Sequence, residues 1–212
     1  MQNWFKTMLI AALSFVCVIG FSSPGIGQSL WSAIPQNATP HTLEQPADLA
    51  TQADIQNNLR AAQSVLMAQG MTVSPFKTYV AIMGGDQIVP NAVMAPSIGT
   101  VGAALAGNRL IVRGSFKDMS SPLRDYATDP LDPPNPNITS AFHIHQGMAS
   151  ENGPFQYALD VMLDETGYGG RVMGDYMLTD EQLAALDSNM LYVDVHTTWY
   201  RGGELRGVLM AE

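Results

Sequence analysis

The 212-residue sequence contains almost no cysteine, because Cys17 is the only one. Cys17 lies in an apolar stretch near the N-terminus, and cleavage of a signal peptide there would remove it. No disulfide can then form in the mature chain, so burial and hydrogen bonds alone must hold the fold, even in an oxidising compartment.

Basic residues are also scarce. The chain has 10 Lys and Arg against 19 Asp and Glu, which gives a formal net charge of −9, and it contains no basic run. Nucleic acids and anionic lipid surfaces bind to clustered Lys and Arg. We therefore expect neither as a partner, and interpret the acidic excess as a contribution to solubility.

The features that usually mark an enzyme are missing as well. No serine stands in a glycine elbow, and the chain has neither a phosphate-binding glycine loop nor a dinucleotide fingerprint. Acid–base chemistry by Asp194 with His196, or by Glu204, is chemically feasible, but one such pair on neighbouring strands is more often structural. The sequence therefore predicts a protein that is not an enzyme.

The N-terminal residues have the pattern of an export signal. Residues 1–27 combine a positive start at Lys6, an apolar core over residues 8–21 and small residues from Ser22 to Gly27. The apolar core is shorter than a comfortable membrane span. We expect a signal peptide, with an uncleaved anchor as the alternative. The mature protein is then periplasmic, on the cell surface or secreted, without membrane insertion.

Two segments of different composition follow the signal. Residues 28–50 are rich in Pro, Gln, Ala, Ser and Thr, which predicts a disordered linker. Residues 51–70 predict an amphipathic helix that Thr51 caps and Gly70 ends. Its apolar residues recur at helical spacing and are Ile55, Leu59, Ala62 and Leu66. We expect this stripe to dock on the following domain; association with a partner or a second copy is the alternative.

The remaining residues, 76–212, have the pattern of a β-domain. Eight segments of strand length are separated mostly by turn residues. They are residues 76–83, 98–105, 109–116, 140–145, 155–163, 171–178, 191–197 and 204–210. A short helix with a capping box formed by Thr179 and Gln182 is inserted among them. The expected fold is all-β, an antiparallel β-sandwich or barrel of about eight strands.

A proline-rich segment interrupts the strands between Phe116 and Ser140. Proline at this density is incompatible with a helix or an inner strand, so we expect a long exposed loop. A loop on a rigid β-scaffold is a candidate binding surface, here for an extracellular protein or a glycan. The alternative is a neutral insertion without a role.

Three of the four histidines occur in two of the predicted strands, and only His41 lies elsewhere. Side chains alternate along a strand, so His143 and His145 leave the same face of the first strand. The same alternation places Asp194 and His196 together on the polar face of the second. The sequence therefore predicts that imidazoles gather on polar strand faces.

Histidines grouped in this way are candidate metal ligands. The proposed set is His143, His145 and His196. Neutral imidazole binds copper or zinc well, and three rings leave one position for water or a fourth ligand. Asp194 is expected to orient a ring or to ligate, and Glu204 to accept a hydrogen bond behind the ligands. The alternative is a structural network with a cross-strand ion pair between Glu204 and Arg206.

Several motifs occur in the order and spacing typical of one family. They are Asp86–Pro90, Gly99–Leu105, His143–Gly147, Asn152–Pro154, Leu183–Leu186, Leu191–Thr197 and Gly202–Gly207. In these motifs, residues 76–212 resemble the CHRD domain, a module named from chordin and found in many exported bacterial proteins. The resemblance implies an extracytoplasmic, β-rich module whose biochemical role is mostly unassigned; in chordin it belongs to a secreted antagonist of growth factors.

The chain departs from the CHRD pattern in two places. The proline-rich segment is longer than the family would lead us to expect, and Gln87 begins a run in which Glu-Val-Pro-Pro is usual. The His-x-His strand also resembles the metal-binding strand of copper/zinc superoxide dismutases. The chain lacks the cysteine pair and the remaining histidines of a dismutase, so that activity is not predicted.

Overall fold

The computed structural model of the chain describes residues 46–70 and 76–212. The predicted signal peptide, most of the predicted linker, Cys17 and His41 lie outside these residues. No helix within the described part is long and apolar enough to cross a membrane.

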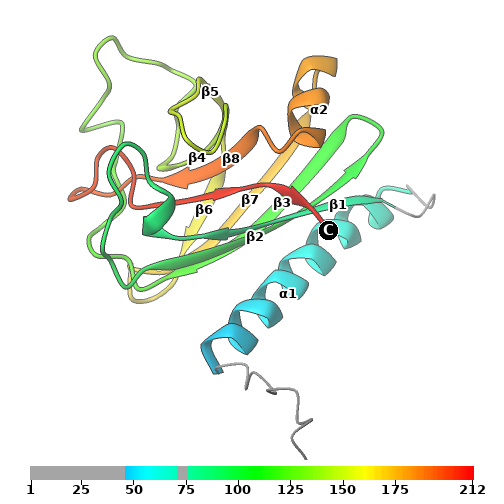
Figure 1. Cartoon of the computed structure of the whole chain (residues 1–212), viewed down its shortest axis with the longest axis horizontal. Helices are drawn as coiled ribbons and strands as arrows, with labels where there is room; N and C mark the ends of the chain where they lie inside the picture. The colour runs from blue at the N-terminus through cyan, green and yellow to red at the C-terminus, as the bar shows by residue number, and fades with distance from the viewer. Residues whose placement is uncertain (1–45, 71–75) are drawn as a thin grey trace, which may run out of the picture. The chain divides into compact units, whose positions relative to one another are not determined.

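Two antiparallel sheets form the domain, in agreement with the predicted all-β sandwich (Figure 1). The strand order is β10-β1-β2-β3-β7-β6 in the six-stranded sheet and β5-β4-β8-β9 in the four-stranded sheet. The strands are β1 (Lys77–Met83), β2 (Ile98–Ala106), β3 (Arg109–Lys117), β4 (Phe142–Gln146), β5 (Phe155–Ala158), β6 (Asp160–Leu163), β7 (Gly170–Met177), β8 (Leu191–Val195), β9 (Leu205–Val208) and β10 (Met210–Ala211). The helices are α1 (Pro46–Ala68), the single turn η1 (Gly85–Gln87) and α2 (Asp180–Asp187).

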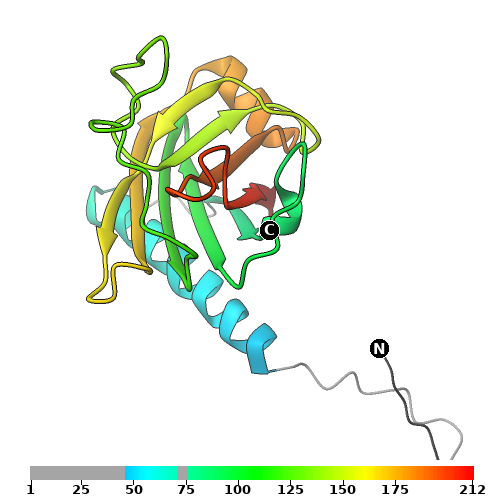
Figure 2. The ribbon, with the colours of Figure 1, turned by 90° about the vertical axis from the view of Figure 1, so that its left-hand side faces the viewer.

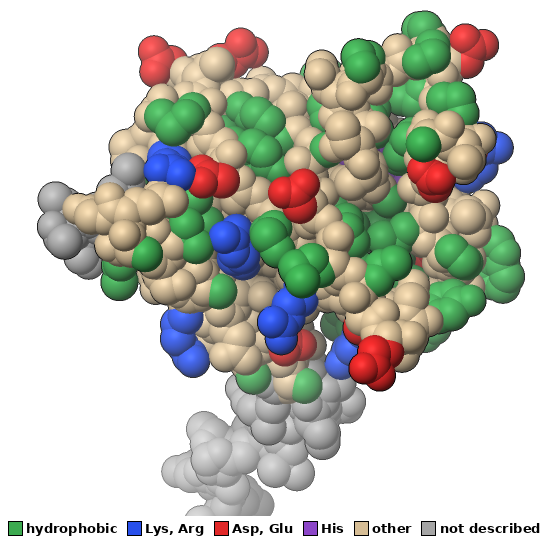
Figure 3. Space-filling model, turned by 180° about the vertical axis from the view of Figure 1, so that it is seen from behind, with side chains coloured by type: hydrophobic (Ala, Val, Ile, Leu, Met, Phe, Trp, Pro, Cys, Tyr) green, Lys and Arg blue, Asp and Glu red, His purple; other side chains and the backbone are tan. Residues whose placement is uncertain are grey.

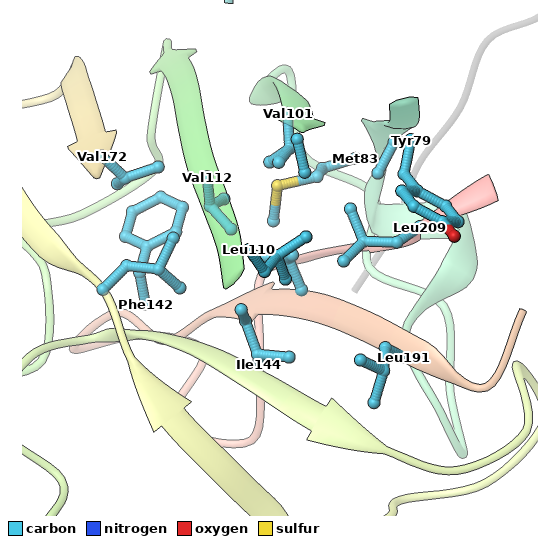
Figure 4. Close-up of a cluster of buried hydrophobic side chains, with 14 of the residues drawn as sticks. Tyr79, Met83, Val101, Leu110, Val112, Phe142, Ile144, Val172, Leu191 and Leu209 are labelled. Carbon is cyan, nitrogen blue, oxygen red and sulfur yellow. The ribbon is translucent and has the colours of Figure 1, made fainter. Parts of the chain in front are cut away.

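Apolar side chains of the two sheets meet in one core. Figure 4 shows Leu110 and Val112 of β3 facing Phe142 and Ile144 of β4, with Leu191 of β8 beside them. All five of these side chains are 0–1% exposed. Because alternate residues of β4 and β8 enter this core, the residues between them must lie on the outer face of the four-stranded sheet.

Two of the predicted strands each divide between the two sheets. The segment at 155–163 runs in β5 up to Ala158 and then continues in β6 of the other sheet, and the C-terminal segment passes likewise from β9 to β10. The residues at the crossings, Leu159 and Leu209, are both 0% exposed. Each fills the core where its strand changes sheets, so the sequence shows an apolar residue at the crossing and no sign of the break.

Helix α1 covers the outer face of the six-stranded sheet (Figure 2). The predicted apolar stripe is buried, with Ile55 and Leu59 at 3% and Leu66 at 0% exposure. A Cβ on Gly102 of β2 would come within 2.5 Å of the Leu59 backbone nitrogen, so the close approach of the helix requires glycine there. The helix begins at Pro46, earlier than predicted, because proline fits the first helical turn, where its missing N–H has no partner to lose.

Helix α2 has the predicted capping box. The Thr179 hydroxyl accepts a hydrogen bond from the Gln182 backbone N–H, and the Gln182 side chain accepts one from the Thr179 N–H. These bonds satisfy two of the backbone donors that a helix start leaves without partners.

The proline-rich segment between β3 and β4 is anchored on the loop that follows β8. Leu123 forms an isolated bridge with Thr197, and the Arg124 N–H donates to the carbonyl of His196 at 3.0 Å. The prediction of an exposed loop is wrong for the first part of the segment, where Ser121 is 2% and Arg124 8% exposed. An arginine among Pro and Asp resembles a surface residue in the sequence, but here backbone carbonyls and a carboxylate receive its guanidinium.

Candidate metal centre

The pairing of three strands places ionisable residues in one row across the four-stranded sheet. His143 of β4 lies opposite Asp194 of β8, and Asp194 lies opposite Arg206 of β9. Neighbours in such a row are close enough for their side chains to interact directly. Strand alternation predicted the shared face, but not the register that aligns these three residues.

His145 and His196 reach the same place by different routes. The register of β4 against β5 shifts between Ile144 and His145, an irregularity of the kind that re-aims a side chain. His196 follows the last residue of β8, and its backbone N–H donates to the carbonyl of Ala141 at 3.0 Å. The structure therefore brings all three predicted histidines together with Asp194.

The donor atoms of this histidine–aspartate cluster converge. One ligand atom from each of His143, His145, Asp194 and His196 lies within 4.8 Å of all the others. The Asp194 Oδ1 atom is 3.2 Å from His145 Nε2, 3.3 Å from His196 Nε2 and 3.9 Å from His143 Nδ1. For metal–ligand bonds of about 2.1 Å, tetrahedral geometry places donors roughly 3.4 Å apart. The distances to Asp194 are close to that spacing.

The outer nitrogen of each ring faces a backbone carbonyl. His143 Nε2 lies 2.7 Å from the Ser140 oxygen, His145 Nδ1 3.0 Å from that of Gly153, and His196 Nδ1 2.9 Å from that of Arg201. A carbonyl only accepts, so these outer nitrogens carry the hydrogen and donate it. In a neutral ring the inner nitrogen is then left with its lone pair toward the cluster. Metal-binding histidines characteristically have this arrangement.

Two buried atoms at the centre have no hydrogen-bond partner among the residues that the structure describes. They are His145 Nε2 and Asp194 Oδ1, which face each other at 3.2 Å. A carboxylate oxygen and an imidazole lone pair repel one another unless a cation lies between them. A proton can satisfy one such contact, whereas a metal ion can satisfy all four donors at once.

The surroundings of His143 and Asp194 keep these two members of the cluster in the protonation state that suits a metal ligand. Burial lowers the pKa of His143 to about 4, and the nearby His196 adds to this effect. Burial alone would raise the pKa of Asp194, but His145 and His196 outweigh it and lower that pKa below its ordinary value. The ring of His143 is thus neutral and the carboxyl ionised at neutral pH.

Arg206 contacts Asp194 and Tyr192 and so helps to position the cluster. Its side chain is 2% exposed, and its Nη2 atom lies 3.7 Å from Asp194 Oδ2 and donates to Asn152 Oδ1 at 2.6 Å. The guanidinium also lies over the Tyr192 ring, 4.2 Å from its centroid, and that ring stacks on His145 at 5.2 Å. A stack of guanidinium, phenol and imidazole therefore fixes the plane of His145.

The turn between β4 and β5 contributes a residue that sequence reasoning missed. Gly153 accepts from His145 Nδ1 and donates its own N–H to the Tyr192 hydroxyl at 2.9 Å. A Cβ at this position would lie 1.8 Å from the Gln146 carbonyl oxygen, so only glycine allows the approach. The Asn-Gly-Pro motif was visible in the sequence, but its contact with a histidine depends on the folded turn.

The Glu204 carboxylate accepts hydrogen bonds from residues other than the three histidines. It is 0% exposed, and its carboxylate accepts from the Ser120 N–H at 2.7 Å and from the Thr197 hydroxyl at 2.7 Å. Among the described residues, the ion pairs do not include one between Glu204 and Arg206. Glu204 instead fastens the start of the proline-rich segment to the loop after β8.

The cluster is largely buried, but two of its three imidazole rings are partly exposed to solvent. The side chain of His143 is 2% exposed, whereas those of His145 and His196 are 15% and 12% exposed. The face shown in Figure 3 accordingly presents almost no histidine surface, and its acidic and basic side chains are dispersed among other residues. The partial exposure of two rings leaves a route from solvent to the donor atoms.

Together, the fold and the cluster define an antiparallel β-sandwich domain with a histidine–carboxylate site on one outer face. Residues 79–209, more than half of the chain, match the CHRD domain family, and the protein belongs to that family. No curated protein and no solved structure shows significant similarity to the chain.

Proposed function

We propose that this CHRD domain binds one zinc or copper ion through His143, His145, His196 and Asp194. One observation carries the proposal: three outer nitrogens donate to backbone carbonyls, so three lone pairs and a carboxylate oxygen converge. The donors are nitrogen and oxygen without sulfur, a set that suits Zn²⁺ or Cu²⁺. Asp194 then takes the fourth position that three histidines alone would leave open.

Loading of the protein with each metal tests the proposal. Purified protein is dialysed against zinc or copper, and the bound metal is counted by mass spectrometry; we expect one ion per chain. His196→Ala and Asp194→Asn should each weaken binding more than about 100-fold, because changes behind the ligands alone typically cost 10–100-fold. His41→Ala, which also removes one imidazole, is the control and should bind normally.

A lack of bound metal in the wild-type protein would contradict the proposal. Unaltered binding by His196→Ala would do the same, because one of the four donors would then be dispensable.

We also propose that the domain acts outside the cytoplasm as a binding module, without an enzymatic step. The supporting observation is Trp199, which is 73% exposed beside the proline-rich segment and whose backbone N–H is fixed by the Ser121 hydroxyl. Exposed aromatic side chains on rigid loops are common recognition elements.

Array screening against extracellular proteins and glycans tests this second proposal. Trp199→Ser should abolish binding to any partner that the screen finds. Met210→Ser is the control and should not, because Met210 is also exposed, at 54%, but lies on the six-stranded sheet.

A further inference from the structure

We propose that Tyr126 controls the exchange of metal at the histidine–aspartate cluster, acting as a movable cover held by Asp129. This inference rests on the proposed metal binding and concerns how the ion enters and leaves. It assigns a role to the turn at residues 125–129 of the proline-rich segment, which supplies none of the four proposed metal ligands.

Aromatic rings surround the cluster above the sheet. The Tyr126 ring lies 5.4 Å from that of His143 and 6.2 Å from that of His196, measured between centroids. Phe155 lies 5.3 Å from His143, and Tyr192 stacks on His145. A metal ion that reaches the donors therefore passes close to these rings.

Only one of the three rings belongs to a loop. Phe155 and Tyr192 are residues of β5 and β8, so ladder hydrogen bonds hold the backbone that carries each of these rings. Tyr126 lies in a turn whose own bonds are local, with the N–H groups of Thr128 and Asp129 donating to the Asp125 carbonyl at 3.2 and 2.8 Å. The turn can swing as a unit while the sheet stays intact.

Two ion pairs hold this turn closed. Asp129 accepts from Arg124 Nε at 2.9 Å and also pairs with Arg201. The Arg124 guanidinium lies over the Tyr126 ring, 4.5 Å from its centroid, and this cation–π contact helps to hold the ring in place. Asp129 is 37% exposed and Arg201 59%, so the outer pair is accessible to water and salt.

The Arg201 residue connects this cover to a ligand. Its carbonyl accepts from His196 Nδ1 at 2.9 Å and from Arg124 Nη1 at 3.4 Å, while its side chain pairs with Asp129. One residue therefore touches both the ring that would hold the metal and the arginine that holds Tyr126. The turn that carries Tyr126 is thus fixed to the same residue that orients His196.

The test compares the rate of zinc release with the equilibrium affinity. Zinc-loaded full-length protein is mixed with an excess of a coloured chelator, and release is followed in time; affinity is measured separately by competition. Tyr126→Ala should release zinc about tenfold faster, the size expected for losing a ring contact and its cation–π stack, while the affinity changes much less. Tyr126→Phe keeps the ring and should release zinc at the wild-type rate.

Two further variants distinguish opening of the Tyr126 turn from the effect of removing any exposed tyrosine. Asp129→Asn leaves the ring in place but weakens both ion pairs, so it should also speed release and make release less sensitive to salt. Tyr168→Ala removes an exposed tyrosine from the β6–β7 hairpin and should change nothing.

The outcomes distinguish this inference from the proposed function. If the wild-type protein binds neither zinc nor copper, metal binding is wrong, and so is the role of Tyr126 as a cover. If zinc binds but Tyr126→Ala and Asp129→Asn release it no faster than Tyr168→Ala does, only the role of Tyr126 is overturned. A fall in affinity as large as the gain in rate would also overturn it, because Tyr126 would then stabilise the bound state instead of gating it.

Discussion

The outer faces of the two sheets are both covered, but in different ways. On the six-stranded sheet, α1 buries an apolar stripe, and the Asn58 amide beside this stripe donates to Thr100 and Ser115 at 3.1–3.2 Å. On the four-stranded sheet, the cover is a loop and the groups beneath it are ionisable. Four buried side-chain atoms of the described residues lack partners, and three of them belong to His145, Asp194 and Arg206.

The helix-covered face contributes to stability, whereas the loop-covered face holds the groups that we propose bind a metal. Apolar burial and satisfied hydrogen bonds favour folding, whereas each unsatisfied buried polar atom costs about 1–3 kcal/mol. The helix-covered face thus contributes to holding the domain together. The loop-covered face retains groups that oppose folding, and this cost is explicable if a ligand normally occupies them.

The largest effect is expected on the helix-covered face. Leu66→Ala should lower the free energy of unfolding by about 2–5 kcal/mol, because Leu66 is fully buried against Ala104 and Ile111. Chemical denaturation measures the change, and the adjacent Met67→Ala, 55% exposed, is the control. Zinc stoichiometry should stay the same in both variants. A loss of less than about 1 kcal/mol would mean that α1 contributes little to the fold.

A smaller effect is expected at the turn behind the cluster. Gly153→Ala should reduce zinc affinity by about 10–100-fold, because the new Cβ would displace the carbonyl that orients His145. Isothermal titration measures the affinity. Gly202→Ala is the matched control, since a Cβ there meets nothing within 4 Å. Equal affinities in the two variants would remove the orienting role of Gly153.

Acidity should weaken metal binding step by step. Burial lowers the pKa of His145, but contact with Asp194 outweighs it and raises the pKa above its ordinary value. As the pH falls through that raised value the ring gains a proton, which zinc must then displace. The apparent affinity should therefore drop about tenfold per pH unit on the acid side of that pKa and level off on the alkaline side. Titrations across pH check this, and an affinity independent of pH would exclude His145 as a ligand.

The smallest effect is expected at the exposed part of the six-stranded sheet. Arg109→Ala should leave the free energy of unfolding almost unchanged in chemical denaturation, although its guanidinium donates to both oxygens of Asp175 at 2.5–2.8 Å. The two side chains are 26% and 44% exposed, so water replaces much of what is lost. A cost near that of Leu66→Ala would show that this surface ion pair stabilises the face as much as helix packing does.

Local patterns in the sequence predicted much of this arrangement. Alternation placed His143 with His145 and Asp194 with His196, and helical spacing identified the stripe of α1, because both signals depend only on neighbours in the chain. The register of β4 on β8 and the crossings at Leu159 and Leu209 depend on contacts distant in sequence. Tyr126 was missed for the same reason: nothing near it in the chain signals that the turn folds back over the histidines.

The crossings at Leu159 and Leu209 have a mechanical consequence. Since a continuous stretch of backbone enters each layer after leaving the other, the layers cannot slide past one another without stretching covalent chain. A force on β4 or β8 is therefore transmitted through their neighbours β5 and β9 to β6 and β10 of the six-stranded sheet. The domain should respond to such a force as one stiff shell, from the histidines to the strands beneath α1.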